Sequence, residues 1–201
     1  MNRLWYDKKG DYMENILTPL FELIDKKLED GRVILAIDGR SAGGKTTLGT
    51  ILKNKYNCTV LHTDDFFLQP HQRTDERLSE TGGNLDRERF LEEVLLPLSR
   101  NETFNYRRFD CSAFTFEEPV IITPGKLTVI EGAYSMHPDL APFYTASAFI
   151  DVSPEMQKER IIKRNPPHSA NLFFTKWIPM ENRFIEEMQI NQKCDIIIEN
   201  T

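Results

Sequence analysis

A glycine-rich stretch early in the chain combines residue types that bind phosphate groups. It reads GRSAGGKT over residues 39–46 and fits the pattern G-x-x-x-x-G-K-[ST]. Glycines let successive backbone N–H groups point inward around an anion, and the N-terminus of a following helix adds partial positive charge. In this pattern the lysine reaches the β- and γ-phosphates, and the hydroxyl of the next residue binds Mg²⁺. The residues expected to hold the nucleotide are Gly39, Ser41, Ala42, Gly43, Gly44, Lys45, Thr46 and Thr47.

Acidic residues follow two further strand-like segments. Asp64 and Asp65 come after CTVLHT, and Glu131 comes after LTVI. Ligands of a parallel sheet gather at the carboxyl ends of its strands. Phosphoryl transfer needs one carboxylate to accept the proton of the acceptor hydroxyl and another to hold the metal. We predict the first role for Asp64 and the second for Glu131, acting through water; Asp65 is expected to form a turn or to support Asp64, and Asp38 has no assigned role.

The hydropathy pattern supplies elements that would bring these residues together. Continuous apolar runs of strand length, such as RVILAID at 32–38 and ASAFIDV at 146–152, alternate with amphipathic segments. A continuous apolar run indicates a strand that is covered on both faces. Strands that alternate with helices, without an internal repeat, predict an α/β fold with a mostly parallel sheet. The length of 201 residues suits a single domain over residues 1–201.

The first half of the chain also contains predicted helices, a long loop and one segment of undecided type. Apolar residues at helical spacing predict an N-terminal helix within residues 1–31. Residues 66–84 are polar and patternless and are expected to form a long functional loop. A helix is predicted at 85–98, with Asp86 as its cap. The aromatic residues at 104–116 leave the element type open.

The second half of the chain contains further predicted strands. Strands are expected at VIIT (120–123) and KLTVIEG (126–132), around the turn TPGK, and at CDIIIE near the end. Ser153 and Pro154 open the helix PEMQKERIIKR, which is followed by a short loop with two prolines at 165–174. Arg160 and Arg164 lie four residues apart on that helix, where they either neutralise charge on a phosphoryl group or are solvated beside glutamates.

Composition limits the classes of function. The net charge is −6 and no basic block occurs, so a nucleic-acid surface is not expected. No apolar run reaches the roughly 18 residues that span a bilayer. Three dispersed cysteines indicate neither a metal site nor a disulfide framework, and the start of the chain lacks the apolar region of a signal peptide. We expect a cytoplasmic protein; the sequence leaves the oligomeric state open.

Several motifs, taken in order, resemble the uridine kinase-like nucleoside kinases, relatives of phosphoribulokinase, pantothenate kinase and nicotinamide riboside kinase. They are HTDDFF, NLDRERF, VIEG and IDVSPEMQKERIIKRN, within residues 32–198. The resemblance implies a three-layer α/β/α core, ATP with Mg²⁺ as donor, and a nucleoside or riboside as acceptor, with a lid at about 165–175. It also implies that Asp64 is catalytic, that Asp86 grips the ribose hydroxyls, that Tyr106 packs against the base, and that Arg160 and Arg164 are lid arginines.

Two other classes of protein remain open at this point. A regulatory protein could hold a nucleotide without transferring phosphate, but Lys45, Thr46, Asp64 and Glu131 are all present. A partner-coupled ATPase would not need the acceptor-side features after Asp65. A switch GTPase is disfavoured because Asn54-Lys55 is not followed by the aspartate of a guanine-reading motif. The acceptor also stays open, because residues 109–112 read FDCS where uridine and cytidine kinases carry a histidine.

Overall fold

A computed structural model describes residues 10–200, with side chains from residue 15 onward. The helices are α1 (Gly10–Asp30), α2 (Lys45–Tyr56), α3 (Asp75–Ser79), α4 (Arg87–Phe90), α5 (Leu96–Ser99), α6 (Pro154–Arg164), α7 (Pro167–Leu172), α8 (Ile178–Glu187) and α9 (Ile190–Lys193). The strands are β1 (Val33–Gly39), β2 (Thr59–His62), β3 (Phe104–Tyr106), β4 (Phe109–Asp110), β5 (Thr115–Phe116), β6 (Val120–Ile122), β7 (Leu127–Glu131), β8 (Ala146–Asp151) and β9 (Ile196–Glu199).

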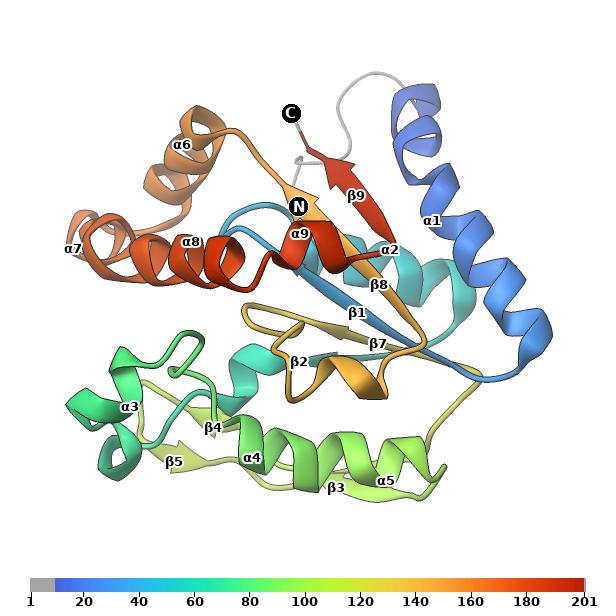
Figure 1. The fold of residues 1–201 in the computed structure, drawn as a ribbon, viewed down its shortest axis with the longest axis horizontal. Helices are drawn as coiled ribbons and strands as arrows, with labels where there is room; N and C mark the ends of the chain where they lie inside the picture. The colour runs from blue at the N-terminus through green and yellow to red at the C-terminus, as the bar shows by residue number, and fades with distance from the viewer. Residues whose placement is uncertain (1–9, 201) are drawn as a thin grey trace.

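Five of these strands form one parallel sheet in the order β2-β7-β1-β8-β9, as Figure 1 shows. Helices α1 and α2 cover one face, and the helix running from α4 to α5 lies with α8 and α9 on the other (Figure 1). The predicted α/β fold with three layers is therefore confirmed. Because all strands run the same way, their carboxyl ends lie at one edge of the sheet, where the predicted site residues occur.

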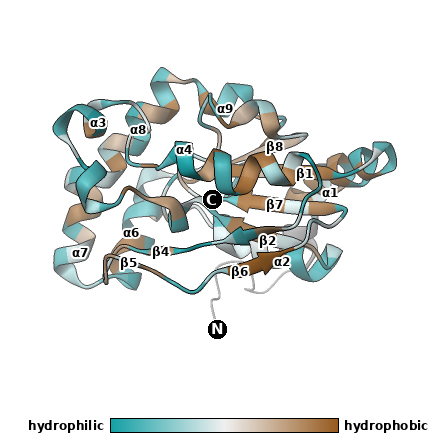
Figure 2. Cartoon of the chain, turned by 90° about the horizontal axis from the view of Figure 1, so that it is seen from below, coloured by the Kyte–Doolittle hydropathy of each residue, from teal (hydrophilic) through white to brown (hydrophobic). Residues whose placement is uncertain are grey.

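The residues of β1 show why both faces are covered. Val33, Leu35 and Ile37 pack against α1 and α2, whereas Ile34 and Ala36 pack toward the opposite helices. Side chains alternate across a strand, so a continuous apolar run places apolar groups on both sides. Figure 2 shows the same arrangement, with largely hydrophobic β1 and β7 between helices whose outer turns are hydrophilic.

The N-terminal helix is part of this core. Leu17, Leu20 and Ile24 are buried against the sheet at helical spacing. Residues 1–9 of the predicted N-terminal segment lie outside the described residues. Within residues 10–200, no helix is long and apolar enough to cross a membrane.

The strand predicted at VIIT is confirmed as β6, which pairs antiparallel with β3 in a separate ribbon outside the main sheet. Two other sequence predictions about local structure were wrong. Residues 66–84 contain a 3₁₀ turn at Pro70–Gln72 and helix α3, so they are not one structureless loop. Residues 165–174 are mostly helical, because Pro167 stands at the first position of α7, where a missing N–H costs nothing. From α7 the chain continues through a π-helical turn into α8.

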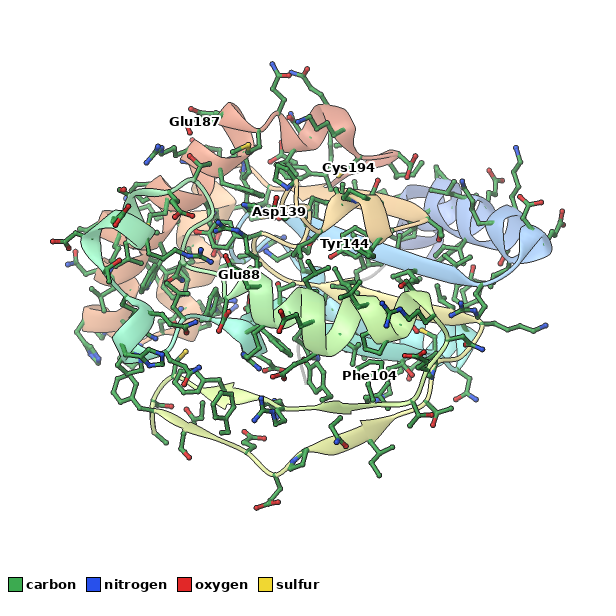
Figure 3. All side chains as sticks on the ribbon, turned by 60° about the horizontal axis from the view of Figure 1, so that its bottom comes forward. Glu88, Phe104, Asp139, Tyr144, Glu187 and Cys194 are labelled. Carbon is green, nitrogen blue, oxygen red and sulfur yellow. The ribbon has the colours of Figure 1, made fainter. Side chains whose placement is uncertain are left out.

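The helix at 85–98 was predicted correctly in position and cap. It runs from α4 through a π-helical turn at Leu91–Leu95 to α5, and the Asp86 side chain accepts the N–H of Arg89 at its start. Leu85 and Phe90 are both fully buried, as expected for a hydrophobic staple. Figure 3 shows Glu88 in the first turn of this helix and Phe104 on the strand beneath it.

Candidate active site

The phosphate loop (residues 39–46) connects β1 to α2 at the carboxyl edge of the sheet. Gly39 has φ +142°, and a Cβ there would lie 2.2 Å from the carbonyl oxygen of Ile150. Only glycine fits such an approach. Gly44, with φ +110°, is the residue before α2, and no side chain caps the start of this helix. The N-terminal N–H groups of this 12-residue helix thus remain available to an anion, as the motif predicted.

Lys45 lies across the loop it follows. Its Nζ donates hydrogen bonds to the carbonyl oxygens of Gly39 at 2.6 Å and Arg40 at 3.2 Å. Among the residues described, this ammonium group forms no ion pair within 4 Å, which leaves it available to a bound anion. The loop therefore offers glycine-framed amides, a helix N-terminus and a cation, a donor set that fits a polyphosphate.

Asp64 and Glu131 come together at the ends of β2 and β7, as predicted. Asp64 Oδ1 accepts the N–H of Ala133 at 3.3 Å. Gly132 has φ +142°, and a Cβ there would lie 2.1 Å from Thr63 Oγ1 and 3.0 Å from Asp64 Oδ1. A glycine after Glu131 is thus what lets the two strand ends approach each other. Glu131 is buried, and its Oε1 lies 2.5 Å from Nδ1 of His62.

The electrostatic surroundings of Asp64 suit proton transfer. The Asp64 side chain is exposed at the carboxyl edge of the sheet, with many protein atoms nearby. Desolvation by these atoms raises the pKa of Asp64, the charge of Lys45 lowers it, and the charge of Glu131 raises it further. A carboxylate with a raised pKa is a stronger base than an ordinary aspartate once it is ionised.

Asp64 also lines a cavity of about 390 Å³. Its walls contain two phenylalanines, three further acidic or basic side chains and small polar groups: Phe67, Phe109, Arg108, Asp110, Glu117, Cys111 and Ser112. These residues come from the segments after β2 and around the β4–β5 hairpin. A small molecule in this cavity would meet Asp64 on one side.

Comparison with known proteins identifies the family. No protein-family model matches the chain. The human protein Nicotinamide riboside kinase 2 is 30% identical over 172 residues, which cover 80% of this chain and 70% of the relative. The chain belongs to the uridine kinase-like P-loop kinase family. As a member of this family of small-molecule kinases, it uses a nucleotide, and the predicted family and enzyme class are confirmed.

Solved structures agree with this assignment at the level of fold. A possible uridine kinase from Bacillus stearothermophilus has a TM-score of 0.64 at 19% identity, covering 90% of this chain and 99% of that one. A D-glycerate 3-kinase from Cryptococcus neoformans has a TM-score of 0.63 at 10% identity, covering 92% and 96%. Both support the same arrangement of sheet and helices in this kinase.

Tyr106 takes a position that the sequence did not suggest. Its ring is buried against Phe66, and its hydroxyl donates to Asp65 Oδ2 at 2.6 Å and accepts the N–H of His62 at 3.0 Å. Arg108 also reaches Asp65, with Nε 3.1 Å from Oδ1. Asp65 thus holds Tyr106 and Arg108 at the end of β2, and Tyr106 has little surface left for contact with a base.

Asp86 is a buried helix cap with both oxygens engaged. Oδ1 accepts the N–H of Arg89 at 3.2 Å and Oδ2 accepts Nε2 of Gln72 at 2.9 Å. The guanidinium of Arg89 lies 3.5 Å from Oδ2. The cap is therefore present, and any contact of this kinase with ribose hydroxyls must share these oxygens.

The two predicted lid arginines contact different parts of the protein. Arg160 donates to the carbonyl of Ala42 at 3.2 Å and to Asn200 Oδ1 at 3.2 Å, so it binds the outside of the phosphate loop. Arg164 is exposed and stacks over Phe173, with 5.3 Å from its Cζ to the ring centroid. Neither arginine forms an ion pair with a glutamate of α6 among the residues described.

Two further acidic residues lie near the loop, Asp38, which had no assigned role, and Glu181, which sequence reasoning missed. Asp38 is buried, and its oxygens accept the N–H groups of Gly39 at 2.7 Å and Met136 at 2.8 Å. Glu181 of α8 is also buried; its Oε2 accepts the N–H of Ser41 at 2.9 Å, and its Oε1 accepts the Ser41 hydroxyl. The position of Asp38 at a strand end was visible in the sequence, but its partner Met136 was not. Glu181 carried no sequence signal, because it lies 140 residues from its partner.

Helix α8 also contacts residues at the end of α3 and just after it. Arg183 donates to the carbonyl of Ser79 at 2.9 Å, and the Thr81 hydroxyl donates to Glu187. Figure 3 labels Glu187 on α8. One helix of the kinase therefore contacts both the phosphate loop and the segment that follows α3.

Proposed function

We propose that this kinase transfers the γ-phosphoryl group of ATP, with Mg²⁺, to a hydroxyl of a riboside. The observation that carries the proposal is the position of Asp64. It lines the cavity of about 390 Å³ and also lies within the electrostatic influence of Lys45 in the phosphate loop. A carboxylate between a phosphate site and an acceptor cavity is the arrangement that phosphoryl transfer to a hydroxyl requires.

On this proposal, residues 39–47 hold the triphosphate and Lys45 neutralises its charge. The Thr46 hydroxyl and Glu131 would hold Mg²⁺, Glu131 through water, and the metal would offset charge on the phosphates. Oxygen ligands of this kind are those that Mg²⁺ prefers. Asp64 accepts the proton of the acceptor hydroxyl. Arg164, exposed on α6 before the proposed lid of residues 165–175, is a candidate for contact with the moving phosphoryl group, whereas Arg160 is engaged elsewhere.

The charges around the cavity favour a neutral or cationic acceptor. Asp64, Asp110 and Glu117 supply three carboxylates against the single guanidinium of Arg108. An anionic acceptor would be repelled, while the aromatic faces of Phe67 and Phe109 suit a flat or cationic ring. The relative at 30% identity is named for nicotinamide riboside, whose ring carries a positive charge. We therefore propose nicotinamide riboside first and pyrimidine nucleosides second, with Asp86 and Tyr106 shaping the same region.

The test is ADP release from the purified protein with Mg²⁺ and ATP. The acceptors compared are nicotinamide riboside, uridine, cytidine and the anionic control D-glycerate. Nicotinamide riboside should stimulate release. The Asp64→Asn variant should lose about two to four orders of magnitude in turnover, because a general base contributes that much, and it should still bind ATP.

Three results would contradict parts of the proposal. Stimulation by glycerate alone would reject the riboside. Hydrolysis of ATP that no acceptor changes would favour a partner-coupled ATPase, and tight ATP binding without any turnover would favour a regulatory protein. Unchanged turnover in Asp64→Asn would remove that residue from the chemistry.

A further inference from the structure

Three consecutive carbonyl groups of the phosphate loop are bound from outside by side chains that the motif does not contain. The carbonyl of Ser41 accepts Nε2 of Gln157 at 3.0 Å, that of Ala42 accepts Arg160 at 3.2 Å, and that of Gly43 accepts Nδ2 of Asn200 at 2.5 Å. We infer that Gln157 and Asn200 are positioning residues that set the direction of two loop amides for the nucleotide phosphates, and that Arg160 holds the peptide between them. This inference deepens the proposed function and rests on it.

The geometry of the peptide group connects these carbonyls to phosphate binding. A trans peptide is planar, and its C=O and N–H groups point in opposite directions. Holding the carbonyls of Ser41 and Gly43 outward therefore turns the N–H groups of Ala42 and Gly44 toward the inside of the loop. Among the described residues, these two N–H groups have no hydrogen-bond partner. Free donors that face inward are what an anion requires.

The three side chains are fixed in turn by their own surroundings. Gln157 is 5% exposed and Asn200 is 6% exposed, so neither amide can turn to water instead. Asn200 Oδ1 accepts Arg160 at 3.2 Å while its Nδ2 faces Gly43, so the partners define the orientation of the amide. The backbone N–H of Asn200 bonds the carbonyl of Asp151 at 2.9 Å, which ties the residue to the end of β8.

These contacts come from elements distant in the sequence. Gln157 and Arg160 lie one turn apart on α6, and Asn200 follows the last strand of the sheet. One guanidinium nitrogen of Arg160 donates to the carbonyl of Ala42 in the loop, and another donates to the side chain of Asn200. The N–H of the peptide that Arg160 holds, that of Gly43, donates to the carbonyl of Arg40 at 3.0 Å, so Arg160 stabilises the loop between the two free amides.

The experiment measures binding of ADP and of inorganic pyrophosphate by calorimetry to the full chain. The variants are Gln157→Leu and Asn200→Leu, and Gln192→Leu at an exposed position of α9 is the matched control. Each buried variant should bind both ligands about tenfold more weakly, since it leaves a buried carbonyl unpartnered and its peptide free to turn. Adenosine, which has no phosphate, should bind each variant as it binds the wild type.

A second readout excludes a merely structural effect. In the nucleotide-free protein, ¹⁵N-resolved amide resonances of Ala42 and Gly44 should shift or broaden in the variants and stay unchanged in Gln192→Leu. If Gln157→Leu does not fold, the isosteric Gln157→Glu replaces it, since its oxygen would face the Ser41 carbonyl without a proton to donate.

The outcomes separate the inference from the proposed function. Wild-type affinity for ADP and pyrophosphate in both folded variants overturns the inference and leaves the proposed function intact. An equal loss of adenosine and pyrophosphate binding also overturns it, because that loss would reflect general damage. If the wild-type protein binds neither ADP nor pyrophosphate, both the proposed function and the inference fail.

Discussion

Nδ1 of His62 lies 2.5 Å from Oε1 of Glu131, across the pair formed by β2 and β7. The two residues are direct register partners in neighbouring parallel strands, so the sheet itself sets this contact. Glu131 is buried and faces His62, which is partly exposed. The carboxylate proposed to support the metal therefore has a titratable, partly exposed partner at the carboxyl end of β2.

The pKa of His62 should lie above its ordinary value of 6.5. The hydrogen bond to Glu131 raises it most, burial lowers it, and the charge of Glu131 raises it further. The folded protein therefore binds this proton more tightly than the unfolded chain does. The resulting stabilisation is fully present below pH 6.5 and is lost as the pH rises through the folded value. Titration of the imidazole signal by proton NMR measures this pKa directly.

The Glu131→Gln variant should lower the pKa of His62, because the charged partner is gone. Glu199→Gln, at an exposed position on the edge strand β9, serves as the control and should leave the titration of His62 unchanged. A titration of His62 that is the same in wild type and Glu131→Gln would mean that the contact does not exist in solution.

Replacement of Lys45 by alanine should abolish turnover and leave the fold intact. The ammonium group donates only to two loop carbonyls, so the folded protein without nucleotide depends little on it. ADP affinity should fall by about 10- to 100-fold, the usual scale for a charged hydrogen bond. Calorimetry and thermal melting measure the two effects. Lys53→Ala, on the exposed face of the same helix, should behave as wild type, and full activity in Lys45→Ala would remove the phosphate-loop assignment.

Replacement of Asp86 by alanine should destabilise the protein by about 1–2 kcal/mol through loss of the helix cap. The loss also leaves Gln72 and the largely buried Arg89 without this partner. Urea unfolding measures the stability. If Asp86 also binds the acceptor, Asp86→Asn should raise the acceptor KM while it keeps part of the cap. An unchanged KM with lower stability would show that Asp86 is a cap alone.

The carboxyl group of Asp38 should titrate at about pH 6, since burial raises its pKa from 3.8 despite hydrogen bonds from Met136 and Gly39. The folded state then binds more protons than the unfolded state between these values. This group therefore destabilises the fold at pH 7 by about 3 kcal/mol, and the penalty disappears as the pH falls toward 4. Carbon-13 NMR of the labelled carboxyl measures the midpoint, and a value of 3.8 would contradict the expected burial effect.

The sequence predicted the parts of the kinase that depend on local pattern. The phosphate loop, α2 and the strand ends with Asp64 and Glu131 follow from motif spacing and from apolar runs. The prediction of a loop at 165–174 was wrong. Two adjacent prolines favour a loop, but Pro167 occupies the first position of helix α7. A proline ends a helix when it lies inside one but is favoured at the first helical position, and the local sequence does not show which of the two applies here.

Contacts between distant segments could not be predicted in the same way. Glu181 meets Ser41 across 140 residues, and Asn200 meets Gly43 across 157. A glutamate in an amphipathic helix usually faces solvent, and an asparagine after a strand usually belongs to a turn. Only the packing of α8 and β9 against the loop turns these residues inward. The hydrogen bond of Tyr106 could not be predicted for the same reason, since its hydroxyl partner Asp65 lies 41 residues away.

Helix α8 sets a fixed distance between the phosphate loop and the segment that follows α3. Glu181 binds the phosphate loop, and Glu187 contacts Thr81 after α3. Six residues of α-helix rise roughly 9 Å, and each added residue turns the helix by about 100°. A one-residue insertion between the two glutamates would therefore rotate one contact away from its partner, whatever residue was inserted. The length of this helix should tolerate less change than its exposed side chains do.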